Sequence, residues 1–264
     1  MSDRTWIDSE DRGLQYGDGL FETISCSAGR PRWLALHLQR LRRGCERLQL
    51  RFDAFDELAQ QVAALAVGAE RCIVKLILTR GVARRRGYRP TGDESPTLLV
   101  RRHEWPDDRP PPEPGFRVAF SNVRLGMNPL LAGLKHLNRL EQVMAQNAMR
   151  DCALEEVLML SSAGQVIAGS MSNVFFADDS GLFTPALDDC GVAGVMRQVV
   201  CTEAQRQGLR VQVRAVQPAE LAGVREAFVT NVRWGVQSIA ELCGRPLPGR
   251  SHAHALRIKL DAAA

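Results

Sequence analysis

The first hundred residues alternate between two apolar patterns, one typical of β-strands and the other typical of helices. In the strand-like runs apolar residues occupy every second position, as at Val74 and Leu76. In the helix-like runs leucines recur three or four positions apart, as at Leu34, Leu38 and Leu41. The patterns predict two strands over 20–34 with a turn at Ala28-Gly29, helices over 34–50 and 56–67, and strands over 71–81 and 95–102.

A proline-rich segment interrupts this alternation. Five prolines fall within residues 101–115, and proline is excluded from helix interiors and from central strands. We therefore expect a smaller N-terminal α/β domain over 1–105, a linker over 106–115, and a larger C-terminal α/β domain over 116–264 that contains Lys135.

The C-terminal part mixes strand and helix patterns without a strict strand–helix–strand rhythm. This mixture favours a mixed α/β (α+β) fold over a doubly wound parallel sheet. The predicted elements are a strand over 116–122, a helix from about Lys135 to Arg150, a pair of strands within 155–177, a helix over 194–208, strands over 209–216 and 226–231, and a weak C-terminal helix.

The composition argues against several classes of function. No apolar run approaches the roughly 20 residues of a membrane-spanning helix, and no secretory signal is visible, so we expect a cytoplasmic protein. The net charge of +4 comes from scattered arginines without interleaved aromatic residues, which favours an anionic small-molecule ligand over nucleic acid. Seven cysteines and five histidines show no metal-ligand spacing, so we expect reduced thiols and no metal.

A single lysine, Lys135, stands in the run LLAGLKHLNRLEQVMAQNAMR, where a helix is expected to begin after Ala132 and Gly133. The helix dipole disfavours a cation at that end, and with partial burial it would lower the pKa of the amine. A lowered pKa is what an amine nucleophile needs for a Schiff base. The alternative interpretation is a surface lysine at the start of a helix.

A glycine-bearing turn runs directly into the predicted helix at 194–208. The backbone N–H groups of Gly194, Val195 and Met196 would point outward at the positive end of the helix dipole, which suits a phosphate. Ordinary turn chemistry is the alternative here, as it is for the glycines of 17–23 and 164–173.

Seven segments together resemble the fold-type IV pyridoxal-phosphate (PLP) enzymes, a family that includes branched-chain and D-amino-acid aminotransferases and 4-amino-4-deoxychorismate lyases. The resemblance runs from about Asp11 to Ile239, and the segment NPLLAGLKHLNRLEQV is most similar to the lyases. The segments, in family order, are DRGLQYGDGLFET, HLQRL, LTRGVARRRGY, KHLNRLEQV, GQVIAGSMSNVFF, GVAGVMRQ and FVTNVRWGV.

The resemblance implies a two-domain homodimer that binds PLP and a small-molecule substrate with two carboxylates. Lys135 would be the Schiff-base lysine that holds PLP and shuttles protons. Arg40 would bind the cofactor phosphate, since a guanidinium fork suits a phosphate dianion, and the N–H groups of Val195 and Met196 would cap it. The remaining implied positions are Thr230 and Asn231 at the phosphate, and Thr23, Arg86 and Tyr88 at the substrate.

Ala168 departs from the family pattern, in which a glutamate before the GSxSN motif pairs with the PLP pyridine nitrogen. Without that carboxylate PLP is a weaker electron sink, which matters most for the long-lived carbanion of a transaminase. The resemblance of the Lys135 segment to the lyases implies an enzyme that converts 4-amino-4-deoxychorismate to p-aminobenzoate and pyruvate, and Ala168 weakens the aminotransferase alternative more than this one. A D-amino-acid or branched-chain aminotransferase, or a homologue disabled by Ala168, remains an alternative.

Overall fold

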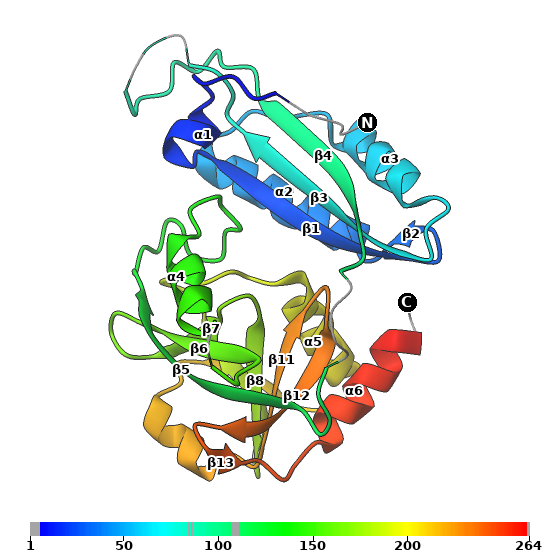
Figure 1. The fold of residues 1–264 in the computed structure, drawn as a ribbon, viewed down its shortest axis with the longest axis vertical. Helices are drawn as coiled ribbons and strands as arrows, with labels where there is room; N and C mark the ends of the chain where they lie inside the picture. The colour runs from blue at the N-terminus through cyan, green and yellow to red at the C-terminus, as the bar shows by residue number, and fades with distance from the viewer. Residues whose placement is uncertain (1–5, 84, 86, 107–110, 151, 263–264) are drawn as a thin grey trace. The chain divides into compact units, whose positions relative to one another are not determined.

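The computed structural model describes residues 6–83, 85, 87–106, 111–150 and 152–262 (Figure 1). The chain divides into two compact units, and each is described by itself. The first unit consists of Met1–Pro106 together with Lys135–Asn138, and the second of Asp107–Leu134 and Arg139–Ala264. In the described part of the chain, no helix has the length and apolar character to cross a membrane.

The first unit is an antiparallel sheet with helices packed on one face. Its elements are α1 (Arg12–Tyr16), β1 (Gly19–Ser27), β2 (Arg30–Pro31), α2 (Leu34–Leu48), α3 (Phe55–Ala66), β3 (Arg71–Thr79) and β4 (Thr97–Glu104). The sheet has the order β2-β1-β3-β4. Alternate strand residues such as Ile24 and Val74 share a core with Leu41 of α2 and Leu58 of α3. The strands and helices predicted over 20–102 are confirmed, whereas the short α1 was not predicted.

The segment Lys135–Asn138 corrects two expectations about Lys135. The N–H of Phe21 donates to the Lys135 carbonyl (3.0 Å), and the N–H of Leu137 donates to the Gly19 carbonyl (3.1 Å). These bonds hold the segment against β1, so Lys135 belongs to the first unit and not to the C-terminal domain. The segment is therefore extended rather than helical, and helix α4 (Leu140–Ala148) begins five residues after Lys135.

The second unit is a large mixed sheet with helices around it, which confirms the expected mixed α/β class. Its other elements are β5 (Phe116–Leu125), β6 (Glu156–Ser161), β7 (Val166–Gly169), β8 (Asn173–Asp178), β9 (Gly181–Pro185), α5 (Val195–Arg206), β10 (Val211–Arg214), η1 (Pro218–Gly223), β11 (Glu226–Asn231), β12 (Gly235–Leu242), β13 (Arg245–Pro246) and α6 (Ser251–Ala262). The strand order is β10-β9-β8-β11-β12-β5-β6-β7, with β13 paired to β12. β5 runs parallel to both β6 and β12, and the pairs β6–β7, β8–β9, β8–β11 and β11–β12 are antiparallel.

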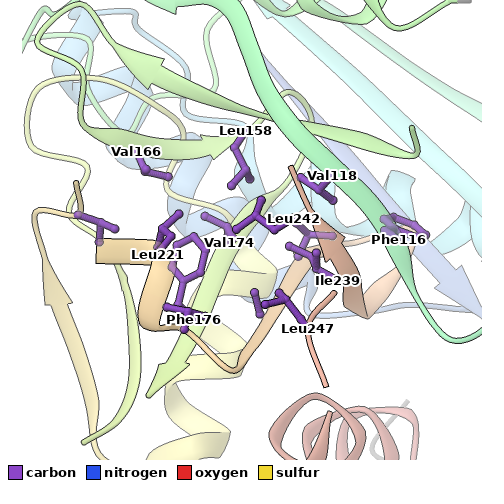
Figure 2. Close-up of a cluster of buried hydrophobic side chains, with 14 of the residues drawn as sticks. Phe116, Val118, Leu158, Val166, Val174, Phe176, Leu221, Ile239, Leu242 and Leu247 are labelled. Atoms are coloured by element: carbon purple, nitrogen blue, oxygen red, sulfur yellow. The ribbon is translucent and has the colours of Figure 1, made fainter. Parts of the chain in front are cut away.

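Apolar side chains from four of these strands meet in the core of the second unit (Figure 2). Val118 of β5, Leu158 of β6, Val174 of β8 and Ile239 of β12 are all fully or almost fully buried. Residues 155–177 form three strands, β6, β7 and β8, in place of the predicted pair. The extra turn arises at Ser170–Ser172, where the N–H of Gly169 donates to the Ser172 carbonyl (2.8 Å).

Candidate active site

Lys135 faces Phe21 across the edge of β1. Its Nζ atom lies 4.1 Å from the centroid of the Phe21 ring, close enough for the ring face to attract an ammonium group. Both residues are partly buried. The surroundings of the amine are therefore set by an aromatic ring and a sheet edge, and not by the dipole of a helix, since α4 begins only at Leu140.

Three ionisable side chains, Glu22, His37 and Arg40, form a buried cluster between β1 and α2. Arg40 donates from Nε to Oε1 of Glu22 (2.7 Å) and from Nη2 to Oε2 (2.5 Å). Nδ1 of His37 lies 2.7 Å from the same Oε2. Glu22 is 1% exposed and His37 is 0% exposed, so the carboxylate fixes the guanidinium of Arg40 from inside the unit.

The electrostatics of this cluster favour a charged carboxylate. Burial by itself raises the pKa of Glu22, but the charge of Arg40 and the hydrogen bonds of His37 and Arg40 outweigh it and lower that pKa to about 2. Burial lowers the pKa of His37 despite the neighbouring carboxylate. Because the charged Glu22 carboxylate can only accept, Nδ1 of His37 is the donor in this contact. The stabilisation from Glu22 is complete above its ordinary pKa of 4.5 and is lost as the pH falls towards 2.

The N-terminus of α5 in the second unit has backbone N–H groups that suit an anion. In the described part of the chain the N–H groups of Val195 and Met196 have no hydrogen-bond partner, as is usual in the first turn of a helix. Asn173 fixes the preceding loop, because its Oδ1 accepts from the Gly194 N–H (3.1 Å) and its Nδ2 donates to the Val192 carbonyl (3.0 Å). A Cβ at Gly194 would lie 2.1 Å from Asn173 Oδ1, so glycine is required there.

Thr230 and Asn231 lie near this helix end but use their side chains within the second unit. Thr230 pairs with Asn173 across β11 and β8, and its hydroxyl donates to the Gly235 carbonyl (2.7 Å). Asn231 accepts from the N–H groups of Arg233 (2.9 Å) and Trp234 (2.8 Å). Both side chains therefore shape the β11–β12 turn, and their contact with a phosphate stays a prediction.

The structure places the three residues implied for substrate binding in different surroundings. Thr23 follows Phe21 by two residues in β1, so both side chains emerge on the same face of the sheet. Tyr88 is 84% exposed, and its ring meets the ring of Tyr16 edge-on with centroids 5.3 Å apart. Arg86 lies outside the described residues.

Ala168 lies in an apolar environment. It packs in a buried cluster with Val157, Met159 and Ile167. The fully buried carboxylate of Glu156 lies in the same part of the unit, where it accepts from the Ser172 hydroxyl (2.8 Å) and from the N–H (3.1 Å) and hydroxyl of Ser170. Sequence reasoning missed Glu156 and Asn173, because their roles depend on partners at least 14 residues away.

The described residues fit PLP as a cofactor. An amine suited to its aldehyde group is present at Lys135, and a guanidinium held on one edge by Glu22 is present at Arg40. Within the second unit, the N–H groups of Val195 and Met196 at the start of α5 suit a phosphate.

Known proteins share this chain's sequence and fold over most of its length. Residues 19–242 match the model of the amino-transferase class IV family. The chain is 32% identical to the aminodeoxychorismate lyase of Vibrio harveyi, over 90% of this chain and 88% of that protein. The crystal structure of 4-amino-4-deoxychorismate lyase from Pseudomonas aeruginosa is 38% identical, with a TM-score of 0.90 over 98% of this chain and 96% of that one.

A more distant relative shares the fold alone. A hypothetical aminotransferase from Mycobacterium tuberculosis, solved in a PLP-bound form, is 22% identical with a TM-score of 0.83, over 100% of this chain and 94% of that one. The family model covers far more than half of the sequence, and the resemblance to fold-type IV enzymes is thereby confirmed. This chain belongs to the amino-transferase class IV family.

Proposed function

We propose that this protein is an aminodeoxychorismate lyase, which converts 4-amino-4-deoxychorismate to p-aminobenzoate and pyruvate for folate synthesis. The observation that carries the proposal is the amine of Lys135 beside the Phe21 ring, within the segment most similar to the lyases. The 32% and 38% identities to two such lyases, each over nearly the whole chain, support it. We retain the expectation of a cytoplasmic enzyme.

PLP is the cofactor that we propose for this reaction. When bound, PLP withdraws electrons from the carbon that carries the substrate amine, which makes its proton acidic. Lys135 would hold PLP covalently through Nζ. Arg40 would bind its phosphate, together with the N–H groups of Val195 and Met196.

Lys135 is the group that we propose to move the protons. Its unprotonated amine would remove the proton from ring carbon 4, which carries the substrate amine. The electron pair of that C–H bond becomes a ring π-bond as the adjacent carbon–oxygen bond breaks, so the ring becomes aromatic. The enolpyruvyl group leaves with the electrons of the broken bond, gains a proton from Lys135 or from water, and becomes pyruvate.

An aminotransferase is the alternative, and Ala168 argues against it. Transamination requires a carbanion that survives until it is reprotonated on the cofactor. The methyl group of Ala168 and its apolar neighbours offer no carboxylate to keep the cofactor ring protonated. Elimination depends less on the cofactor as an electron sink, because the electrons pass directly to the breaking carbon–oxygen bond.

Replacing Lys135 tests the assignment of the amine. Lys135→Ala should fold, lose the absorbance band of covalently held PLP, and release pyruvate at least a thousandfold more slowly, since both the attachment point and the proton carrier are gone. Lys259→Ala, which removes an exposed lysine of α6, is the matched control. Pyruvate release from Lys135→Ala at a rate near that of the parent would refute the assignment.

Replacing Arg40 tests the phosphate site. Loss of one charge-assisted partner should cost about 1.5–3 kcal/mol of cofactor binding, or roughly ten- to a hundredfold in PLP affinity. Arg43→Ala removes an exposed arginine of the same helix and serves as the control. Titration of each apoprotein with PLP measures the affinity, and circular dichroism checks the fold, because Arg40→Ala leaves Glu22 without a guanidinium. Parental affinity in Arg40→Ala contradicts the assignment.

Restoring a carboxylate at Ala168 separates lyase from transaminase chemistry. The parent should release pyruvate without a glutamate at this position. Ala168→Glu should increase the slow conversion of PLP to its amine form, because it lengthens the lifetime of the carbanion. The new carboxylate enters an apolar cluster, so we expect lower stability as well. Both products are measured after cofactor loading has been equalised. A parent without lyase activity and a variant that gains it would show that the function proposed here is wrong.

We also propose that the protein is a homodimer. Helix α4 presents an exposed apolar face, where Leu140 is 76%, Val143 is 51% and Met144 is 58% exposed, and such a face commonly marks an interface. A double substitution of Leu140 and Val143 to Asp should shift the protein towards monomer in sedimentation equilibrium. Ile258→Asp, on exposed α6, is the control. A parent that is monomeric at tens of micromolar would exclude this dimer.

A further inference from the structure

The face of the first unit's sheet that points away from α2 and α3 carries polar side chains among apolar ones. The opposite face contributes Leu20, Ile24, Val74 and Leu76 to the core with the helices, so the intervening residues emerge on the other side. In the register of β1 and β3 the pairs on that second face are Phe21 with Ile77, Thr23 with Lys75, and Ser25 with Ile73.

Lysine is rare in this chain, which makes its placement on this face informative. Three of the 34 basic residues are lysines, and the others are arginines. Two of these three lysines flank the same ring, since Nζ of Lys135 is 4.1 Å and Nζ of Lys75 is 5.9 Å from the centroid of Phe21. The two ammonium groups are therefore no further apart than the sum of these distances, 10.0 Å.

Lys75 presents an exposed ammonium group on the sheet of the first unit. It lies in β3, between β1 and β4, where lysine has a low intrinsic propensity. Its direct partner on β4 is Arg101, so two basic side chains are neighbours in the register of these strands. Among the described residues no carboxylate lies within ion-pair distance of Lys75. An exposed ammonium group without a carboxylate partner can bind an anion.

The substrate of the proposed function carries a carboxylate at a distance from its amine that would bring it near Lys75. In 4-amino-4-deoxychorismate the amine and one carboxylate occupy opposite ends of a six-membered ring. If the amine is at Lys135 and the ring packs against Phe21, the ring carboxylate would extend one ring length beyond. Lys75 and Thr23 are the polar residues on that side of Phe21, directly opposite each other in the register.

We propose that Lys75 and Thr23 bind the ring carboxylate of the substrate, with Phe21 supporting the ring between Lys75 and Lys135. This inference rests on the proposed function and names the residues that determine its substrate specificity. The Lys75 ammonium is a compact charge that pairs with one carboxylate oxygen, and the Thr23 hydroxyl donates to the other. The same carboxylate remains on p-aminobenzoate, so the product binds through the same two groups.

The experiment compares two ligands that differ only in the carboxylate. The holoenzyme is titrated calorimetrically with p-aminobenzoate and with p-aminobenzamide, its neutral analogue. The parent should prefer the acid by about tenfold or more, as expected for one charge-assisted hydrogen bond. Lys75→Gln should abolish that preference and Thr23→Val should reduce it, whereas Lys259→Gln, on exposed α6, should keep it.

Kinetics distinguish binding from a general disturbance. Lys75 is exposed, so Lys75→Gln should fold and keep the absorbance band of bound PLP. Its KM for 4-amino-4-deoxychorismate should rise about tenfold or more, with a smaller change in kcat. Lys75→Arg should recover part of the acid preference, because it restores the charge but not the compact geometry.

The outcomes separate this inference from the function on which it rests. If the parent releases pyruvate but shows no preference for the acid, or if Lys75→Gln keeps the preference, the carboxylate site is refuted and the function stands. If the parent releases no pyruvate from 4-amino-4-deoxychorismate, the function fails, and this inference fails with it.

Discussion

Two backbone hydrogen bonds decide where the reactive amine lies. The Phe21 N–H donates to the Lys135 carbonyl, and the Leu137 N–H donates to the Gly19 carbonyl. These bonds attach a short segment, more than 100 residues further along the chain, to the edge of β1. This pairing places the Lys135 side chain on the same face as Phe21. A one-residue slip would move the lysine to the opposite face, so the position of the amine depends on the register.

The buried carboxylate of Glu22 imposes a second constraint. An unpaired charge at such a site would cost several kcal/mol, so His37 and Arg40 must both remain in place for the unit to be stable. The same requirement makes Arg40 rigid before any ligand arrives. A guanidinium fixed in advance loses little conformational entropy on binding an anion, so a structural necessity also serves the proposed phosphate site.

The sequence predicted local features well and long-range contacts poorly. The strands and helices of 20–102 follow from apolar periodicity, and the helix at 194–208 follows from its glycine turn. The run that follows Ala132 and Gly133 predicts a helix from Lys135, but pairing of this segment with β1 overrides that local preference. The contacts of Glu156 and Asn173 leave no local pattern, since each depends on partners brought close only by the folded sheet.

The apolar environment of Ala168 fits an elimination reaction, which depends little on a protonated cofactor ring. Proton removal and loss of the enolpyruvyl group occur on neighbouring ring carbons, so the electrons need to travel only one bond before the ring becomes aromatic. Such a path places little demand on a protonated cofactor ring. A buried carboxylate at 168 would need a hydrogen-bond or charged partner, and the neighbouring Val157, Met159 and Ile167 offer none. Alanine at this position therefore avoids the destabilisation of an unpaired buried charge. The weaker electron sink that results has little effect on elimination.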